Sequence, residues 1–262
     1  MSDCRMSEVE VHKPQLVFMH IAKTAGTRVN AYFDAQFPDG ETATHVESNP
    51  LWRSEPNWGA TLKFVSGHIV FSEFDERLDL SKCVFVTLVR EPYAHLRSHF
   101  AWIRHLTAPE LEAHLRTYPQ YIQNLAVKLR DTDFTSSENL FRLVSSLEGL
   151  ELHLLENCQT RYFAAPLEQS RVDEHAYSAA KQRLGRVDVL GLTEETDWFL
   201  SKVATRMGFD PPETGKKHNI SNSYYGLDIT GEECRSVLLP LIEYDLKLYR
   251  TAKEITSSAP RA

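Results

Sequence analysis

The sequence predicts an α/β fold in which a central, mostly parallel β-sheet lies between two layers of helices. Short apolar runs rich in β-branched residues recur along the chain, and helix-like segments follow them. Strands that alternate with helices in this way form parallel sheets covered on both faces. In chain order, the predicted strands are residues 15–20, 62–66, 82–89 and 186–191. The predicted helices are residues 24–36, 92–105, 171–184, 193–208 and 231–254.

Residues typical of helix boundaries support these predicted elements, and the chain reads as a single domain. Pro92 is typical of a first helical turn, and Gly208 with the following prolines ends the helix at residues 193–208. Residues 105–146 show helical periodicity and are predicted as a helical insertion. No linker-like stretch interrupts the chain, so we expect a single domain at residues 15–254, a flexible N-terminal segment at 1–14 and a flexible tail at 255–262.

Composition excludes several classes of partner. The formal net charge of −7 argues against a nucleic-acid surface. The longest apolar run, residues 83–89, is too short to cross a bilayer, so no membrane association is expected. The isolated cysteines have neither paired nor metal-ligand spacing, which predicts reduced thiols, no metal site and a cytoplasmic location. We expect a monomer or a homodimer; the cysteines are Cys4, Cys83, Cys158 and Cys234.

The turn after the first strand is predicted to bind an anion. Residues 18–27 read Phe-Met-His-Ile-Ala-Lys-Thr-Ala-Gly-Thr, so a buried strand leads through a turn with one Lys and two Thr into a helix. Backbone N–H groups at a helix start face an anion, and Lys adds a full charge. The alternative is a solvated surface turn. The candidate anion ligands are Lys23, Thr24, Ala25, Gly26, Thr27 and Arg28.

This turn is P-loop-like without matching a nucleoside triphosphatase. Lys23 precedes Gly26, and the leading Gly of Gly-x-x-x-x-Gly-Lys-Ser/Thr is absent. The strand at residues 82–89 is followed by Arg90 rather than by an Asp that could hold Mg²⁺. A nucleotide kinase is therefore disfavoured.

A second anion site is predicted at Arg90 and Ser98. Arg90 follows a buried strand, and Ser98 lies about two turns into the next helix. If that helix packs back on the sheet, both side chains converge on one phosphate, to which the planar guanidinium donates two parallel bonds. The alternative is that Arg90 pairs with Glu91 or another nearby acid.

Together these segments resemble the sulfotransferases that use 3′-phosphoadenosine-5′-phosphosulfate (PAPS), in particular the carbohydrate branch with the heparan sulfate 2-O- and 6-O-sulfotransferases and their bacterial relatives. The resemblance spans residues 15–252 in order, with Ala22 in place of the usual Pro and Arg28 where Ser or Thr is common. Further matching segments are Glu156–Tyr162, Val189–Glu194, Lys217–Ser221 and Glu243–Tyr249.

The resemblance implies a PAPS donor, 3′,5′-adenosine bisphosphate (PAP) as product, and a hydroxyl-bearing carbohydrate or small-molecule acceptor. It implies that residues 20–27 hold the 5′-phosphosulfate and that Arg90 with Ser98 holds the 3′-phosphate. Arg28 either adds charge near the 5′-phosphate or points outward. A late loop would cover the nucleotide through Lys217, Asn219 and Ser221.

The resemblance also implies a catalytic base. His68 follows the second predicted strand in a Gly-His segment that supplies the proposed base of the resembled enzymes. An imidazole with a pKa of about 6.5 is largely neutral near pH 7. The alternative is a packed or surface histidine, and Glu73 is the reserve base. Lys23 would stabilise charge on the leaving oxygen, so no metal is required.

The sequence leaves the roles of several residues open. Gln159 and Arg161 either touch donor or acceptor or support a junction in the fold. Six aromatic residues are candidates for lining an acceptor cleft, and none is favoured over the others: Tyr93, Trp102, Tyr118, Tyr121, Tyr224 and Tyr225. The alternative functions are a non-catalytic PAP-binding protein and, less favoured, a P-loop nucleotide kinase.

Overall fold

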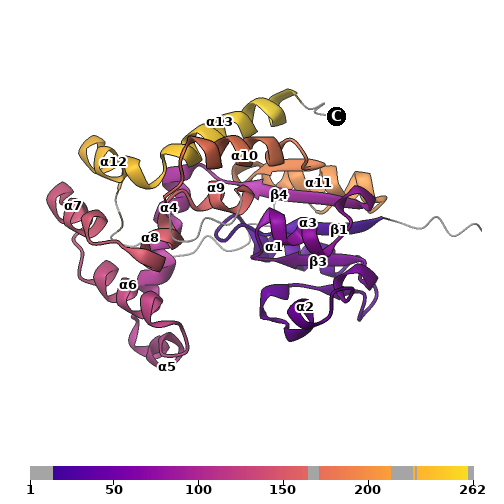
Figure 1. The fold of residues 1–262 in the computed structure, drawn as a ribbon, viewed down its shortest axis with the longest axis horizontal. Helices are drawn as coiled ribbons and strands as arrows, with labels where there is room; N and C mark the ends of the chain where they lie inside the picture. Colours follow the sequence, from indigo (N-terminus) through magenta and orange to yellow (C-terminus); the bar gives the residue numbers. More distant parts are fainter. Residues whose placement is uncertain (1–13, 165–170, 214–226, 228, 259–262) are drawn as a thin grey trace, which may run out of the picture.

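The computed structural model describes residues 14–164, 171–213, 227 and 229–258. Within these residues the chain forms an α/β three-layer fold around a five-stranded parallel sheet in the order β2-β3-β1-β4-β5 (Figure 1). The predicted fold class is therefore confirmed. The strands are β1 (Gln15–Met19), β2 (Thr42–Ala43), β3 (Phe64–Gly67), β4 (Cys83–Val89) and β5 (Val189–Leu192).

Strand register brings three strand ends together. Met19 at the end of β1 pairs with Gly67 of β3 on one side and with Thr87 of β4 on the other. Because all these strands are parallel, the residues that follow them emerge at one edge of the sheet. In open α/β sheets this carboxyl edge is where ligands bind.

Both faces of the sheet are covered by helices because side chains alternate along each strand. Val17 and Met19 of β1 pack with α3, α10 and α13, whereas Leu16 and Phe18 pack with α1 and α11. The bounds are α1 (Gly26–Asp34), α3 (Phe71–Arg77), α10 (Glu174–Leu184), α11 (Thr196–Met207) and α13 (Glu243–Ser258). The short α2 (Pro50–Ser54) buries Trp52 against the same face as α3.

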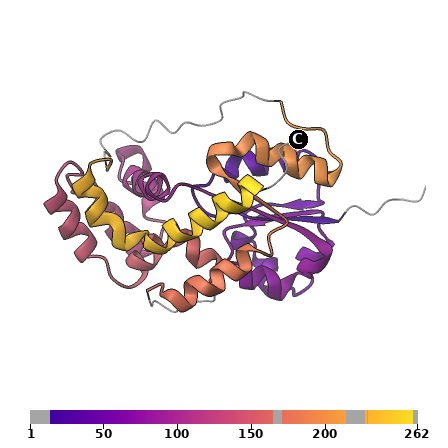
Figure 2. The same ribbon diagram turned by 90° about the horizontal axis from the view of Figure 1, so that it is seen from above.

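A second core lies beside the sheet, in what we name the helical lobe. It consists of α5 (Glu112–Leu115), α6 (Gln120–Arg130), α7 (Ser137–Ser145), α8 (Gly149–Leu155) and α12 (Glu232–Leu238). Figure 1 shows these helices gathered away from the sheet, and Figure 2 shows α13 running from them toward it. Two helices, α4 (Pro92–His105) and α9 (Cys158–Phe163), connect the lobe to the strand ends.

The C-terminal region corrects two predictions. Residues 231–254 are not one helix, because α12 ends at Leu238 and a 3₁₀ turn at Leu239–Leu241 separates it from α13. Pro240 sits in that turn; it lacks an N–H donor and its ring excludes a continuous α-helix. The tail was expected to start at residue 255, but α13 continues to Ser258 and buries Thr256.

Some other boundaries shift. The first predicted helix, 24–36, is shorter and begins at Gly26, because Lys23 and Ala25 adopt left-handed backbone conformations. The two-residue β2 lacks a run long enough to predict. Among the described residues, no helix combines the length and apolar character that a membrane crossing requires.

Candidate functional site

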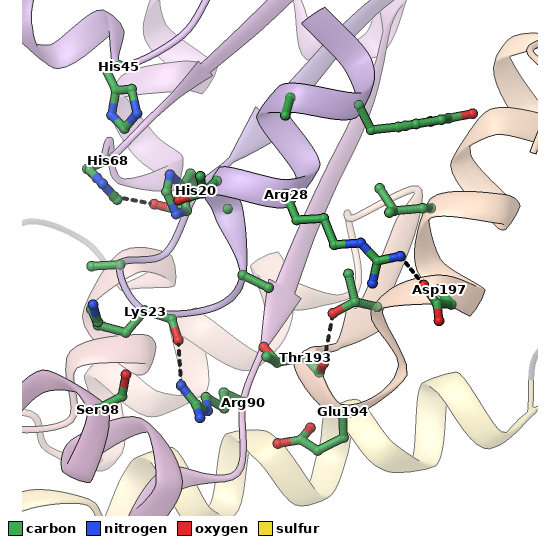
Figure 3. Close-up of a pocket in the computed structure, with 18 of the residues that line it drawn as sticks. His20, Lys23, Arg28, His45, His68, Arg90, Ser98, Thr193, Glu194 and Asp197 are labelled. Carbon is green, nitrogen blue, oxygen red and sulfur yellow. Dashed lines mark hydrogen bonds and ion pairs between the residues drawn. The ribbon is translucent and has the colours of Figure 1, made fainter. Parts of the chain in front are cut away.

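A cavity of about 1940 Å³ opens at the carboxyl edge of the sheet, and we name it the sheet-edge cavity. Its walls come from most of residues 20–28 after β1, from His45, Glu47 and Ser48, from His68 after β3, from Arg90 after β4, and from parts of α4 and α11 (Figure 3). Ligand pockets commonly occupy about 300–1,000 Å³. This cavity therefore has room for two ligands side by side.

The Lys23 loop, residues 20–27, has the backbone of an anion cradle. Lys23 and Ala25 have φ of 68° and 63°, and Ala25 is the N-cap of α1. Left-handed residues within such a turn direct successive N–H groups toward one point. The N-cap residue Ala25 makes no side-chain cap bond to this end of α1, and the first turn of the helix has no acidic residue. The positive end of the helix therefore faces the cavity without a carboxylate from its own first turn.

Side chains from the neighbouring helices fix the loop. His95 Nε2 of α4 donates to the Ala22 carbonyl (2.8 Å), and the Ala22 N–H donates to the Tyr162 hydroxyl of α9 (3.4 Å). Burial lowers the pKa of His95 to about 4, so this imidazole is neutral near pH 7. The Lys23 loop is therefore held from the helical side as well as by β1.

Thr24 corrects one expectation. Its side chain is fully buried, its hydroxyl donates to the Ile21 carbonyl (2.7 Å), and the residue does not line the sheet-edge cavity. The hydroxyl closes the turn on itself and is not directed at an anion. Lys23, Ala25, Gly26 and Thr27 do line the cavity.

Gly26 is needed because the His20 ring lies against it. A Cβ at residue 26 would stand 1.7 Å from His20 Nε2 and 2.0 Å from Cδ2. The ring has little freedom to move away, since it is stacked on Phe18 and buried. The first helical turn of α1 can therefore approach β1 only with glycine at this position.

We expect Gly26→Ala to lower the free energy of unfolding by about 1–3 kcal/mol, because the added methyl group overpacks this contact. Urea unfolding measures the change. Gly231→Ala is the matched control, since a Cβ there meets no atom of the described residues within 4 Å. Equal urea midpoints for the two variants would show that the His20 ring can move away from the added methyl group.

Arg90 lies next to the Lys23 loop. Its Nη1 donates to the Lys23 carbonyl at 3.1 Å, although the two residues are 67 positions apart in sequence. The Glu91 carboxylate, the alternative partner considered for Arg90, caps α4 by accepting from the Tyr93 and Ala94 N–H groups. Ser98 of α4 lines the same cavity, and Figure 3 shows Ser98 and Arg90 on facing sides of one space.

Gln159 and Arg161 take structural positions. Gln159 Oε1 accepts from the Arg90 N–H (2.8 Å) and its Nε2 donates to the Arg90 carbonyl (2.9 Å), so it brackets the Arg90 backbone. Arg161 is buried, forms an ion pair with Glu156 and donates through Nε to the Glu156 carbonyl (2.7 Å). Neither side chain lines the cavity.

His68 is presented to the cavity with a defined tautomer. Its Nδ1 lies 2.8 Å from the His20 carbonyl, which can only accept, so Nδ1 carries the proton and Nε2 keeps its lone pair when the ring is neutral. Burial lowers the pKa of His68 and outweighs Glu47, which acts in the opposite direction. The neutral ring can therefore accept a proton at Nε2.

The reserve base Glu73 lies elsewhere. Its Oε1 accepts from Trp52 Nε1 (2.7 Å) and lies 3.6 Å from Arg77 Nε. Glu73 does not line the sheet-edge cavity. Its contacts support the packing of α2 against α3.

Arg28 lines the cavity, and its guanidinium forms an ion pair with Asp197 of α11 (Figure 3). It therefore links the first turn of α1 to the opposite wall. The three residues expected in the nucleotide-covering loop, Lys217, Asn219 and Ser221, lie outside the described residues.

Sequence reasoning missed several residues of this site. His45 and Glu47 line the cavity from a segment without strand or helix periodicity, so no pattern marked them. His95 could have been found, because it lies one helical turn from Ser98 and therefore on nearly the same face of α4. Two of the aromatic residues that the sequence offered for a cleft wall do line the cavity: the Trp102 ring stands 5.7 Å from Lys23 Nζ, and Tyr118 lies beside it.

A scan against models of protein families finds no match to this chain, and no curated protein matches its sequence significantly.

Proposed function

We propose that the protein is a PAPS-dependent sulfotransferase that transfers a sulfuryl group to a hydroxyl of a carbohydrate or small-molecule acceptor. The observation that carries the proposal is the junction of the Lys23 loop with Arg90 and Ser98 in one cavity, linked at 3.1 Å between Arg90 Nη1 and the Lys23 carbonyl. Two cationic anion-binding ends at fixed spacing suit a nucleotide with phosphates at both ribose positions. His68 in the same cavity supplies a base.

The donor would lie along the carboxyl edge of the sheet. Its 5′-phosphosulfate fits the backbone cradle of the Lys23 loop and the start of α1, where dipole and charge both favour an anion. Its 3′-phosphate fits between Arg90 and Ser98. The remaining cavity volume, bounded by Trp102, Tyr118 and His68, accommodates an acceptor.

In the reaction, the acceptor oxygen attacks sulfur in line with the bond to the 5′-phosphate. As the new S–O bond forms, the old S–O bond breaks and its electron pair stays on the phosphate oxygen of PAP. The acceptor proton passes to His68 Nε2. Lys23 and the N–H groups of its loop stabilise the charge that develops on the leaving oxygen.

Ligand binding and transfer test the proposal together. Calorimetric titration with PAP, PAPS and ATP should give measurable binding for the first two and much weaker binding for ATP, which lacks a 3′-phosphate. Transfer of radiolabelled sulfate from PAPS to a panel of sugars and hydroxylated metabolites should then yield a labelled product. Binding of PAP without any transfer would favour the non-catalytic binder, and preference for ATP with Mg²⁺ would favour the kinase.

We expect Arg90→Ala to weaken PAP binding more than it lowers turnover at saturating PAPS, because Arg90 contacts a phosphate that does not react. Loss of a charge-assisted bidentate contact costs about 1.5–3 kcal/mol, or roughly 10–150-fold in affinity. Calorimetry on Arg90→Ala and on the exposed control Arg53→Ala measures this difference. Unchanged affinity in Arg90→Ala would remove the 3′-phosphate assignment.

A further inference from the structure

Three histidines from separate segments meet in the sheet-edge cavity. His20 follows β1, His45 precedes the 3₁₀ turn Val46–Ser48, and His68 follows β3. A ring nitrogen of each lies within 4.8 Å of the others. The ring centroids of His20 and His68 are 4.1 Å apart, and those of His45 and His68 are 5.5 Å apart (Figure 3).

The lone pairs needed by a metal are present in this cluster. His68 uses Nδ1 for the His20 carbonyl, and His45 Nδ1 lies 3.3 Å from Glu47 Oε1, so both rings keep Nε2 for a ligand. His20 is 6% exposed, and its buried Nδ1 has no hydrogen-bond partner among the described residues.

Glu47 contacts the ring of one of these histidines and the backbone of another. Its Oε1 lies against His45 Nδ1, and its Oε2 accepts from the backbone N–H of His68 at 2.9 Å. A carboxylate on the second ring nitrogen, as at His45, is the usual outer partner of a metal-binding histidine. Its negative charge also opposes the repulsion between a cation and the nearby Lys23.

We propose that His20, His45 and His68 bind one divalent transition-metal ion of the zinc class, with the fourth position open to the sheet-edge cavity. Imidazole nitrogens suit Zn²⁺, and three protein ligands with an open position form the usual accessible zinc site. Zn–N bonds of about 2.0–2.1 Å in a tetrahedron place the nitrogens about 3.3 Å apart. The rings must therefore close slightly, and the exposed His45 is the one with room to move.

The metal would regulate the transfer reaction, a consequence that rests on the proposed function. A metal bound to His68 Nε2 occupies the lone pair that takes the acceptor proton. Zn²⁺ therefore inhibits transfer, and its removal by a chelator restores the base. Sequence spacing predicted no metal site, because the three histidines are 25 and 23 positions apart and only the strand ends bring them together.

A second cluster, His95, His99 and Cys158, is less suited to a metal. All three residues are buried, and His95 Nε2 is already bonded to the Ala22 carbonyl. Burial raises the pKa of the Cys158 thiol, which opposes formation of a thiolate ligand. The experiment must nevertheless separate the two clusters.

Competition of the metal-free protein with a chromophoric chelator for Zn²⁺ tests the site without any activity assay. We expect one Zn²⁺ per chain, at least tenfold weaker binding in His45→Ala, and about 10–100-fold weaker binding in Glu47→Gln. Cys158→Ala and the exposed His175→Ala should bind as the wild type does. Co²⁺ in place of Zn²⁺ should give no sulfur-to-metal charge-transfer band.

Unchanged affinity in His45→Ala, or loss of binding in Cys158→Ala, would overturn the assignment. The regulatory consequence has its own readout, which is sulfate transfer with added Zn²⁺, expressed against the zinc-free rate of each protein. Inhibition should require at least tenfold more Zn²⁺ in His45→Ala than in wild type. Equal inhibition of the two proteins would overturn the proposal that zinc at this site regulates transfer. If Zn²⁺ binds as expected but no transfer is found with any acceptor, the metal site stands and the proposed function fails.

Discussion

Lys23→Ala should slow sulfuryl transfer by about 10²–10³-fold at saturating PAPS. Lys23 is held in a left-handed conformation by the surrounding loop and lines the sheet-edge cavity where the leaving phosphate oxygen would gain charge. Because that charge is larger in the transition state than in bound PAPS, the loss should appear mainly in kcat. The measurement is the initial rate of radiolabelled sulfate transfer to the best acceptor of the panel.

Lys181→Ala is the matched control, since Lys181 is exposed on α10, away from the cavity. PAP affinity should change less than the rate in Lys23→Ala, because the N–H groups of the loop and Arg90 remain. A variant that lost affinity but kept the wild-type kcat would show that Lys23 binds the donor without stabilising the transition state.

His68→Ala should lower the same rate by about 10²–10⁴-fold, the usual contribution of a positioned general base. The tautomer fixed by the His20 carbonyl leaves Nε2 as proton acceptor, and a methyl group cannot replace it. PAP binding and the unfolding midpoint should stay near wild type. His105→Ala, at the exposed end of α4, is the control for loss of a histidine.

The pH dependence of transfer checks the same assignment. A base works while it is deprotonated, so activity falls as the pH drops through its pKa. Burial lowers the pKa of His68 in the ligand-free protein below its ordinary value of 6.5, so the acidic limb of the kcat/KM profile should lie below pH 6.5. The limb should be absent from the residual activity of His68→Ala. An acidic limb above pH 6.5 would point to another base.

Much of the fold follows from local patterns that the sequence displays. In β1 and β4, almost every residue is apolar because both faces of the sheet are covered, and such runs are recognisable without knowledge of the partners. Pro92 and the Glu91 cap mark the start of α4. The positions of Lys23, Arg90, Ser98 and His68 on one cavity then follow from parallel pairing, which gathers the ends of β1, β3 and β4.

The features that sequence reasoning missed depend on contacts between distant residues. Whether the Thr24 hydroxyl faced an anion or its own turn was a question of side-chain direction, which no spacing rule decides. The ion pair of Arg28 with Asp197 joins positions 169 apart. His45 lines the cavity while its own backbone adopts a left-handed φ of 53°, a conformation that no local sequence pattern required. Such features depend on the assembled fold.

The hydrogen bond between the Arg90 guanidinium and the Lys23 carbonyl also fixes the distance between the two proposed anion-binding positions. Gln159 is hydrogen-bonded to the Arg90 backbone, and His95 is hydrogen-bonded to the Ala22 carbonyl. Because Arg90 is also bonded to Lys23, neither position can shift without the other. In the proposed function, we expect a ligand to be selected by the separation of its two charged groups. We expect nucleotides that carry extra phosphates in a single chain to satisfy one end only, whatever their total charge.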